Sequence, residues 1–251
     1  MRLWSFVLAV AGGLGVGLVS SIAGIGGGSL MVPLMVLVLG VDVKVAVASS
    51  LLTIVVTSAF SSSVYLRERL VNLKAALSLE PTTALGAILG ANITVSLPSG
   101  VVRRILGFGL IAVSIMIILK PLLRAEEAEG VGRLRNLHLG AAASFIAGVA
   151  SGMLGIGGGV LKVPVMNLIM SIPIREAVAT SSFMVGLTAS SGGIVYLAKG
   201  LVDPVLVLGL ALGVAPGATI GAKTLKRLKP TYIRLAFSLV LMYAALRLIG
   251  W

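Results

Sequence analysis

Apolar residues fill the chain in long stretches that are separated by short polar or glycine-rich breaks. In the first half these stretches cover residues 3–22, 30–39, 45–66, 73–97 and 105–119. In the second half they cover residues 139–153, 161–170, 176–198, 205–225 and 232–249. An α-helix needs about 20 mainly apolar residues to cross the hydrocarbon core of a bilayer. The pattern therefore predicts an all-α polytopic membrane protein.

The second half of the sequence repeats the first half. Residues 46–48 (AVA) recur as 177–179, and residues 64–66 (VYL) recur as 195–197, an offset of 131 residues in both cases. Shared composition alone would not keep one offset over such a distance. The sequence therefore predicts two internal repeats, residues 1–120 and 138–251, which are joined by a charged linker at residues 121–137.

A Gly-Ile-Gly-Gly-Gly run interrupts an apolar stretch in each half. The two runs are Gly24, Ile25, Gly26, Gly27, Gly28 and Gly155, Ile156, Gly157, Gly158, Gly159. Each helical glycine costs about 1 kcal/mol relative to alanine, so both runs should break a helix. At about 1.5 Å per residue, the ten apolar residues after each run span only about half of the bilayer core. We therefore expect each repeat to contain a glycine-broken helical hairpin near the membrane midplane, followed by three further helices.

Lysine and arginine positions favour an inverted second repeat. If each glycine run is a bend, one side of the membrane holds Arg67, Arg69, Lys74, Lys120, Arg124, Arg133, Arg135, Arg175, Lys223, Lys226, Arg227, Lys229 and Arg234. The other side then holds Arg2, Lys44, Arg103, Arg104, Lys199 and Arg247. Parallel repeats would divide the same residues almost evenly. Because basic residues concentrate on the cytoplasmic side, the bias predicts outside termini and a cytoplasmic linker.

Composition supports a membrane protein and excludes several other classes. The chain is 58% hydrophobic and 11% charged, whereas soluble domains carry about 25% charged residues. The net charge of +12 suits helix orientation and anionic lipids, so no nucleic-acid partner is expected. There is no cysteine and only one histidine, and the eight acids fall mostly in predicted loops, with none clearly within a span to carry a proton. We therefore expect no enzyme activity, no metal and no cofactor.

The glycine runs are the main candidate for a binding site. A broken helix near the midplane exposes backbone N–H groups and the positive end of a helix dipole, and both attract anions. Close helix packing is the alternative role for such small residues. Five residues in a row, present twice, exceed what packing needs, so the sequence favours an anion site.

Several polar residues near the runs could contribute to that site. Lys162 stands three residues after the second run, where the first copy has Met31, and its ammonium suits an oxyanion. The alternative is that Lys162 extends to the membrane surface. If it is buried without a partner, replacing it with methionine should not destabilise the protein. Further candidates are Asn167 and the matching hydroxyl pairs Ser49, Ser50, Thr180 and Ser181, which could donate to an anion or bond back to a helix carbonyl.

The doubled motif resembles the TauE/SafE family of membrane transporters, also called TSUP. The resemblance rests on Gly-Ile-Gly-Gly-Gly-x-Leu-x-Val-Pro in both halves and on Ala-Val-Ala-[Ser/Thr]-Ser downstream of each copy. It implies export of sulfur-containing oxyanions, such as sulfite and organosulfonates, across a prokaryotic plasma membrane.

Together with the broken helices, the resemblance favours a secondary transporter that works by alternating access on a small anionic substrate. A channel-like anion pore and a non-transporting membrane scaffold are the alternatives. A homo-oligomeric assembly stays open.

Overall fold

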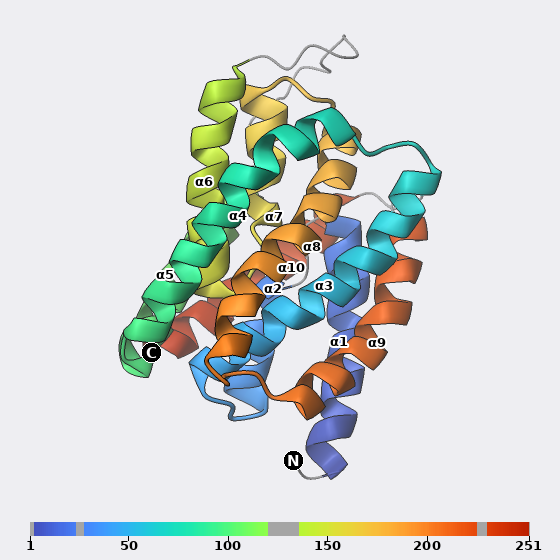
Figure 1. Ribbon diagram of the computed structural model, residues 1–251. Helices are drawn as coiled ribbons and strands as arrows, with labels where there is room; N and C mark the ends of the chain where they lie inside the picture. The colour runs from blue at the N-terminus through green and yellow to red at the C-terminus, as the bar shows by residue number, and fades with distance from the viewer. Residues whose placement is uncertain (1–2, 24–27, 120–135, 225–229, 251) are drawn as a thin grey trace.

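The computed structural model describes residues 3–23, 28–119, 136–224 and 230–250, which form ten α-helices, two short π-helical segments and no strand (Figure 1). The first half contains α1 (Leu3–Ala23), α2 (Gly28–Pro33), η1 (Leu34–Val38), α3 (Val43–Arg67), α4 (Leu73–Ser96) and α5 (Ser99–Leu119). The second half contains α6 (Leu137–Leu154), α7 (Gly159–Pro164), η2 (Val165–Ile169), α8 (Ile174–Ala198), α9 (Pro204–Thr224) and α10 (Pro230–Ile249). The predicted all-α fold is confirmed.

Five helices of the described residues are long and apolar enough to cross a membrane. They are Val43–Arg67, Ser99–Met116, Leu137–Leu154, Ile174–Ala198 and Pro204–Gly221. The outer surface agrees with this, because large apolar side chains such as Leu77, Phe108 and Ile146 point outward and are more than half exposed. Such a surface suits a lipid environment rather than water.

The same helix boundaries recur in the two halves. α2 and α7, α3 and α8, and α4 and α9 each begin 131 residues apart. Two buried tyrosines on α3 and α8 make matching hydrogen bonds. Tyr65 Oη donates to Ser21 O at 3.1 Å, and Tyr196 Oη donates to Gly152 O at 2.8 Å. Each tyrosine therefore caps the end of the first helix of its own half.

Helices from the two halves interlock. α1 packs along α9, and α6 packs along α4, as Figure 1 shows. Glycines make these contacts close: a Cβ atom on Gly13 would lie 3.2 Å from Leu210 Cα, and one on Gly148 would lie 2.9 Å from the carbonyl carbon of Thr83. Small residues let helix backbones approach in this way inside membranes. The buried core is therefore shared between the two halves.

Equivalent helices at the centre run in opposite directions. Ser58 on α3 donates a hydrogen bond to Ser182 O on α8 at 2.6 Å, whereas Leu52, earlier on α3, meets Gly193, later on α8. α3 and α8 are therefore antiparallel. This is the geometry that an inverted repeat requires, because equivalent spans then cross the membrane in opposite senses.

Two hydrogen-bonded loops lie at opposite ends of the molecule. At one end Asn72 N donates to Thr180 Oγ1 at 2.8 Å and Asn72 Nδ2 donates to Glu176 at 2.6 Å. At the other end Asp203 N donates to Ser49 Oγ at 3.4 Å. One end therefore gathers Arg67, Arg69, Lys74 and Arg175, and the other gathers Lys44 and Lys199. This grouping matches the division of charges in the inverted arrangement, and which end faces the cytoplasm stays a prediction.

Candidate functional site

The second glycine run forms a buried break between two helices. α6 ends at Leu154 and α7 begins at Gly159, so the predicted interruption is present. Gly155, Gly157 and Gly158 adopt positive φ angles of 68°, 73° and 73°. Only glycine takes this conformation without a steric cost. The run therefore needs its glycines for backbone shape as well as for packing.

The start of α2 contacts this run from the other half. Gly28 packs against Gly155 O and Ile156, and a Cβ atom on Gly28 would lie 2.8 Å from Ile156 Cα. The sequence-predicted site residues Gly24, Ile25, Gly26 and Gly27 lie outside the described residues. What the structure describes of the two runs is therefore in direct contact.

Two predicted hydroxyls bond to the second run. Ser50 Oγ donates to Gly155 O, and Ser181 Oγ donates to Gly159 O at 3.3 Å. Both side chains are fully buried. The sequence left two roles open for these serines, donation to an anion or donation to a helix carbonyl. Their described bonds go to backbone carbonyls. These bonds hold the shape of the glycine run.

The remaining polar candidates lie in helical segments and bond to backbone groups of nearby loops. Ser49 and Thr180 accept hydrogen bonds from the backbone of Asp203 and Asn72, which precede α9 and α4. Asn167 Nδ2 donates to Ile172 O at 2.8 Å and so closes the turn between η2 and α8. The described contacts of these three side chains are therefore to backbone groups that position helix ends.

Lys162 is fully buried and paired. Its Nζ lies 3.2 Å from Glu80 Oε2 on α4 and also donates to Thr188 Oγ1 on α8. The hydroxyl of Thr188 in turn lies 2.6 Å from Glu80 Oε1. We call Glu80, Thr188 and Lys162 the charged cluster. Complete burial excludes the alternative in which Lys162 extends to the membrane surface.

Glu80 corrects two expectations drawn from the sequence. It is the eighth residue of α4 and is 7% exposed, so one acid does lie buried within a long helix. Lys162 is consequently not an unpaired cation. A signal for Glu80 was present in the sequence, since an ionisable residue inside an apolar stretch is itself a functional indication.

Two buried hydroxyls of α6 in the same region have no hydrogen-bond partner among the residues that the structure describes. Ser144 and Ser151 are fully buried and make no side-chain hydrogen bond. Ser151 lies beside the glycine run, because a Cβ atom on Gly158 would be 3.3 Å from Ser151 Cβ. Ser144 lies one turn before Gly148 on α6. Gly148 packs against Thr83, and Thr83 lies one turn after Glu80 on α4. Buried hydroxyls are normally hydrogen-bonded, so these two keep hydrogen-bonding capacity that the described residues do not use.

Comparison with known proteins places the whole chain in one family. Residues 9–248 match the family model described as Sulfite exporter TauE/SafE. The chain belongs to the TauE/SafE family. It is 29% identical to the probable membrane transporter protein YunE of Bacillus subtilis, with 98% of this chain and 97% of the relative covered. It is 26% identical to the probable membrane transporter protein MJ0441 of Methanocaldococcus jannaschii, over 93% and 91%. No solved structure matches it significantly.

This TauE/SafE protein is therefore a multi-pass membrane transporter, and its charged cluster breaks the symmetry between its halves. At the same offset of 131 residues, Met31 corresponds to Lys162 and Ala211 corresponds to Glu80, while Thr57 corresponds to Thr188. A buried ion pair adds little net stability relative to apolar residues of similar size. The fold accepts neutral residues at the equivalent positions, so the pair points to function rather than to folding.

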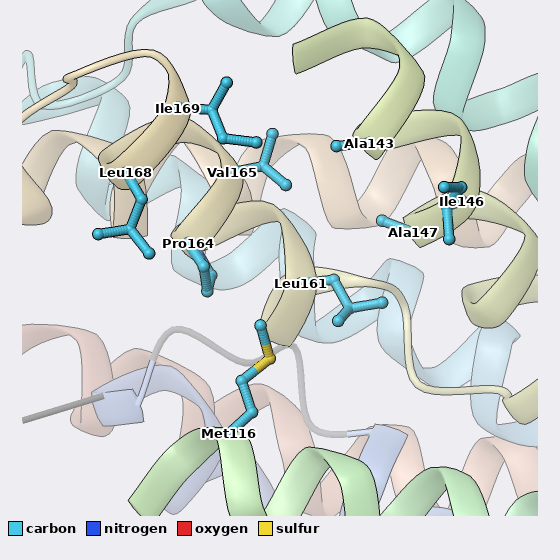
Figure 2. Close-up of a pocket in the computed structure, with 9 residues that line it drawn as sticks. All are labelled: Met116, Ala143, Ile146, Ala147, Leu161, Pro164, Val165, Leu168 and Ile169. Atoms are coloured by element: carbon cyan, nitrogen blue, oxygen red, sulfur yellow. The ribbon is translucent and has the colours of Figure 1, made fainter. Parts of the chain in front are cut away.

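An apolar groove lies on another flank of α7 in this TauE/SafE transporter. Figure 2 shows its side chains, which come from α5, α6, α7 and η2 and enclose about 300 Å³. They are Met116, Ala143, Ile146, Ala147, Leu161, Pro164, Val165, Leu168 and Ile169. The groove offers no polar side chain to an anion. Lys162 is not among its lining residues and turns instead toward α4 and α8.

Among the described residues, no group of three or more histidine, cysteine, aspartate or glutamate side chains is placed to hold a metal ion. The polar chemistry of the described interior near α7 consists instead of one ion pair, hydroxyls and the backbone of the glycine run. These groups can bind an oxyanion through charge and hydrogen bonds.

Proposed function

We infer that this transporter is a secondary transporter that exports a small sulfur-containing oxyanion, sulfite or an organosulfonate, by alternating access. The observation that carries the proposal is the complete burial of Lys162 three residues after a glycine run with positive φ angles. An ionisable group inside a membrane protein is costly and marks a substrate or ion pathway. The sulfur chemistry rests on the description of the matching family model, sulfite exporter.

The groups around α7 suit an oxyanion. The ammonium of Lys162 supplies charge, backbone N–H groups of the glycine run supply hydrogen-bond donors, and Ser151 supplies a buried hydroxyl beside Gly158. Hydrogen bonds to a charged group are about twice as strong as neutral ones. Anion binding by this set needs no metal or cofactor.

The arrangement of the halves supports alternating access. The contact between Gly28 and the Gly155–Ile156 backbone joins the two halves beside the site, and α3 and α8 run antiparallel at the centre. In transporters with inverted repeats, the substrate lies at the interface of the repeats and one repeat moves against the other.

Flux into proteoliposomes tests the proposal and its two alternatives. The purified protein should show saturable transport of radiolabelled sulfite or methanesulfonate, and unlabelled sulfate and thiosulfate are tested for competition. Fast flux without saturation would instead indicate a channel-like pore. A folded protein with no flux of any of these anions would indicate a scaffold and overturn the proposal.

A lysine variant locates the site. In Lys162→Met the binding free energy for the anion should weaken by about 1–3 kcal/mol, the scale of a lost charge-assisted hydrogen bond. Lys162→Arg should restore little, because a planar guanidinium does not fit where a compact ammonium did. Lys199→Met is the matched control, since Lys199 is exposed at the end of α8. Unchanged affinity in Lys162→Met would remove the lysine from the site.

A further inference from the structure

We propose that each anion crosses the membrane together with one proton, that Glu80 takes up this proton, and that the transported species is a monoanion. This inference rests on the proposed function of the same site. It adds the coupling ion and the charge of the substrate.

The geometry makes Glu80 and the anion competitors for one partner. In the structure Glu80 Oε2 lies 3.2 Å from Lys162 Nζ, and both side chains are buried. Lys162 Nζ already donates to Glu80 and to Thr188, so an oxyanion that becomes the main partner of the ammonium displaces the carboxylate. Displacement leaves Glu80 inside α4, where it has lost its cationic partner.

Charge balance then requires a proton. The empty site contains one ammonium and one carboxylate and is neutral. A monoanion alone would leave a net negative charge in a buried site, which is costly in a low-dielectric interior. If a proton from the aqueous side binds to a Glu80 carboxylate oxygen and forms an O–H bond, the site is neutral again. When the anion leaves, this O–H bond breaks, the proton returns to water and Glu80 pairs with Lys162 once more.

The same balance discriminates between anions. A dianion such as sulfate would need a second proton, and the charged cluster contains only one carboxylate. Hydrogensulfite and sulfonates carry a single charge and match the one-proton cycle. The cluster therefore favours monoanions.

Thr188 is placed to stabilise both states of Glu80. Its hydroxyl lies 2.6 Å from Glu80 Oε1 and 3.0 Å from Met184 O, and it accepts from Lys162. With Glu80 ionised, the hydroxyl donates to the carboxylate. With Glu80 protonated, the hydroxyl can donate to Met184 O and accept from the new O–H group. Thr188 thus keeps Glu80 hydrogen-bonded when Lys162 moves to the anion.

Among the described residues, the other titratable groups on helices packed against α4 do not contact Glu80. On α6 this group is His138, which is exposed at the start of the helix. The titratable groups of α8 and its C-terminal end are Arg175, Glu176, Tyr196 and Lys199. Glu176 is bonded to Asn72 at the start of α4, and Tyr196 is bonded to Gly152. Lys74 lies near the start of α4 itself, more than one turn before Glu80. Lys162 is therefore the titratable partner that sets the charge state of Glu80.

The cycle predicts electroneutral transport. One proton and one monoanion move in the same direction, so the membrane potential does no net work on them. An anion that accumulates in the cell would leave down its own gradient together with its proton. An imposed inward proton gradient would drive the reverse reaction.

Proteoliposomes that contain the full-length protein can test the coupling. With an inward proton gradient, radiolabelled sulfite and methanesulfonate should accumulate above equilibrium, and an internal dye should report acidification. A potassium diffusion potential set with valinomycin should not change the rate. In Glu80→Gln, which imitates the protonated acid, anion exchange should continue with tighter apparent affinity, because no carboxylate competes for Lys162. Proton-driven accumulation should fall by roughly tenfold or more, because the empty site now carries an unbalanced ammonium.

Two further variants keep the test decisive. Glu176→Gln, an isosteric change away from the cluster, should retain proton-driven accumulation. The double variant Glu80→Ala/Lys162→Met installs the neutral residues of the equivalent positions and avoids an unpaired charge if Glu80→Gln does not fold. It should lose proton-driven accumulation, and accumulation that persists in it would overturn the inference.

The outcomes separate this inference from the proposed function. Saturable flux that does not respond to the proton gradient would be consistent with the proposed function and would overturn the coupling. Flux that responds to the diffusion potential, or a Glu80→Gln variant that accumulates anion normally, also overturns it. Loss of exchange together with accumulation in folded Glu80→Gln would show that Glu80 serves binding rather than coupling. Absence of all flux in the parent protein defeats the proposed function itself.

Discussion

Gly28 and Gly155, one from each glycine run, are packed backbone to backbone. The Cα of Gly28 faces the carbonyl oxygen of Gly155, and there is no space between them for a side chain. Ser50 donates to this same carbonyl from α3. The oxygen of Gly155 is therefore fixed by contacts from two elements of the other half. This junction joins the start of α2 to the break that precedes α7.

Replacing Gly28 with alanine should disturb this junction. The added methyl group would meet backbone atoms of Gly155 and Ile156, which cannot move as a flexible side chain can. We expect a loss of about 1–3 kcal/mol in stability, as for other overpacked sites, and weaker sulfite transport. Gly15→Ala is the control, because nothing lies within 4 Å of a Cβ atom there. Equal melting temperatures for the two variants would contradict this junction.

Gly158→Val tests the conformation of the second run. Its φ of 73° is one that a β-branched residue adopts only at a cost of about 1–2 kcal/mol, and its Cβ would also crowd Ser151. We expect transport to be abolished by the change in backbone shape at the site. Gly100→Val, at an open position near the start of α5, should transport normally. A folded Gly158→Val protein with normal flux would leave the run a packing element only.

The membrane orientation can be tested with single cysteines, because the parent chain has none. The distribution of basic residues predicts that His138 and position 128 face the cytoplasm and that Lys199 faces outside. Cysteine at Lys199 should react with an impermeant maleimide in intact cells, whereas cysteine at His138 or position 128 should react only after permeabilisation. His138 and Lys199 are both exposed in the structure. The reverse labelling pattern would invert the predicted orientation.

Most of the helical framework could be predicted because local apolar pattern determines it. The stretches at 139–153 and 176–198 correspond closely to α6 and α8. The π-helical segments were not predicted. They directly follow Pro33 and Pro164 and are marked by bonds that reach back five residues, as from Leu39 N to Leu34 O.

The site was predicted only in part because its contacts join distant segments. Lys162 was recognisable as a charge inside an apolar stretch, but the sequence left open whether it is buried or extends to the membrane surface. Its pairing with Glu80 joins positions 82 residues apart through the meeting of α4, α7 and α8. The role of Ser49 was equally hidden, since it accepts from the backbone of Asp203 in the other half. Such partners depend on how helices interlock, and local sequence does not encode this.

The ion pair reverses the stability expected for a methionine at position 162. Lys162→Met leaves the carboxylate of Glu80 buried without a cation, and Glu80→Ala leaves the ammonium without an anion. Removing one partner of a buried pair typically costs about 3–5 kcal/mol, so each single variant should melt at a lower temperature than the parent. The double variant carries the residues that Met31 and Ala211 supply at the equivalent positions. It should recover part of this loss, because no unpaired charge stays buried, although alanine is smaller than glutamate and leaves unfilled volume. Unfolding of the purified proteins in detergent measures the cycle, with Lys199→Met as the exposed control. If the two single losses simply added in the double variant, the two charges would not be coupled and the pairing of Lys162 with Glu80 would be refuted.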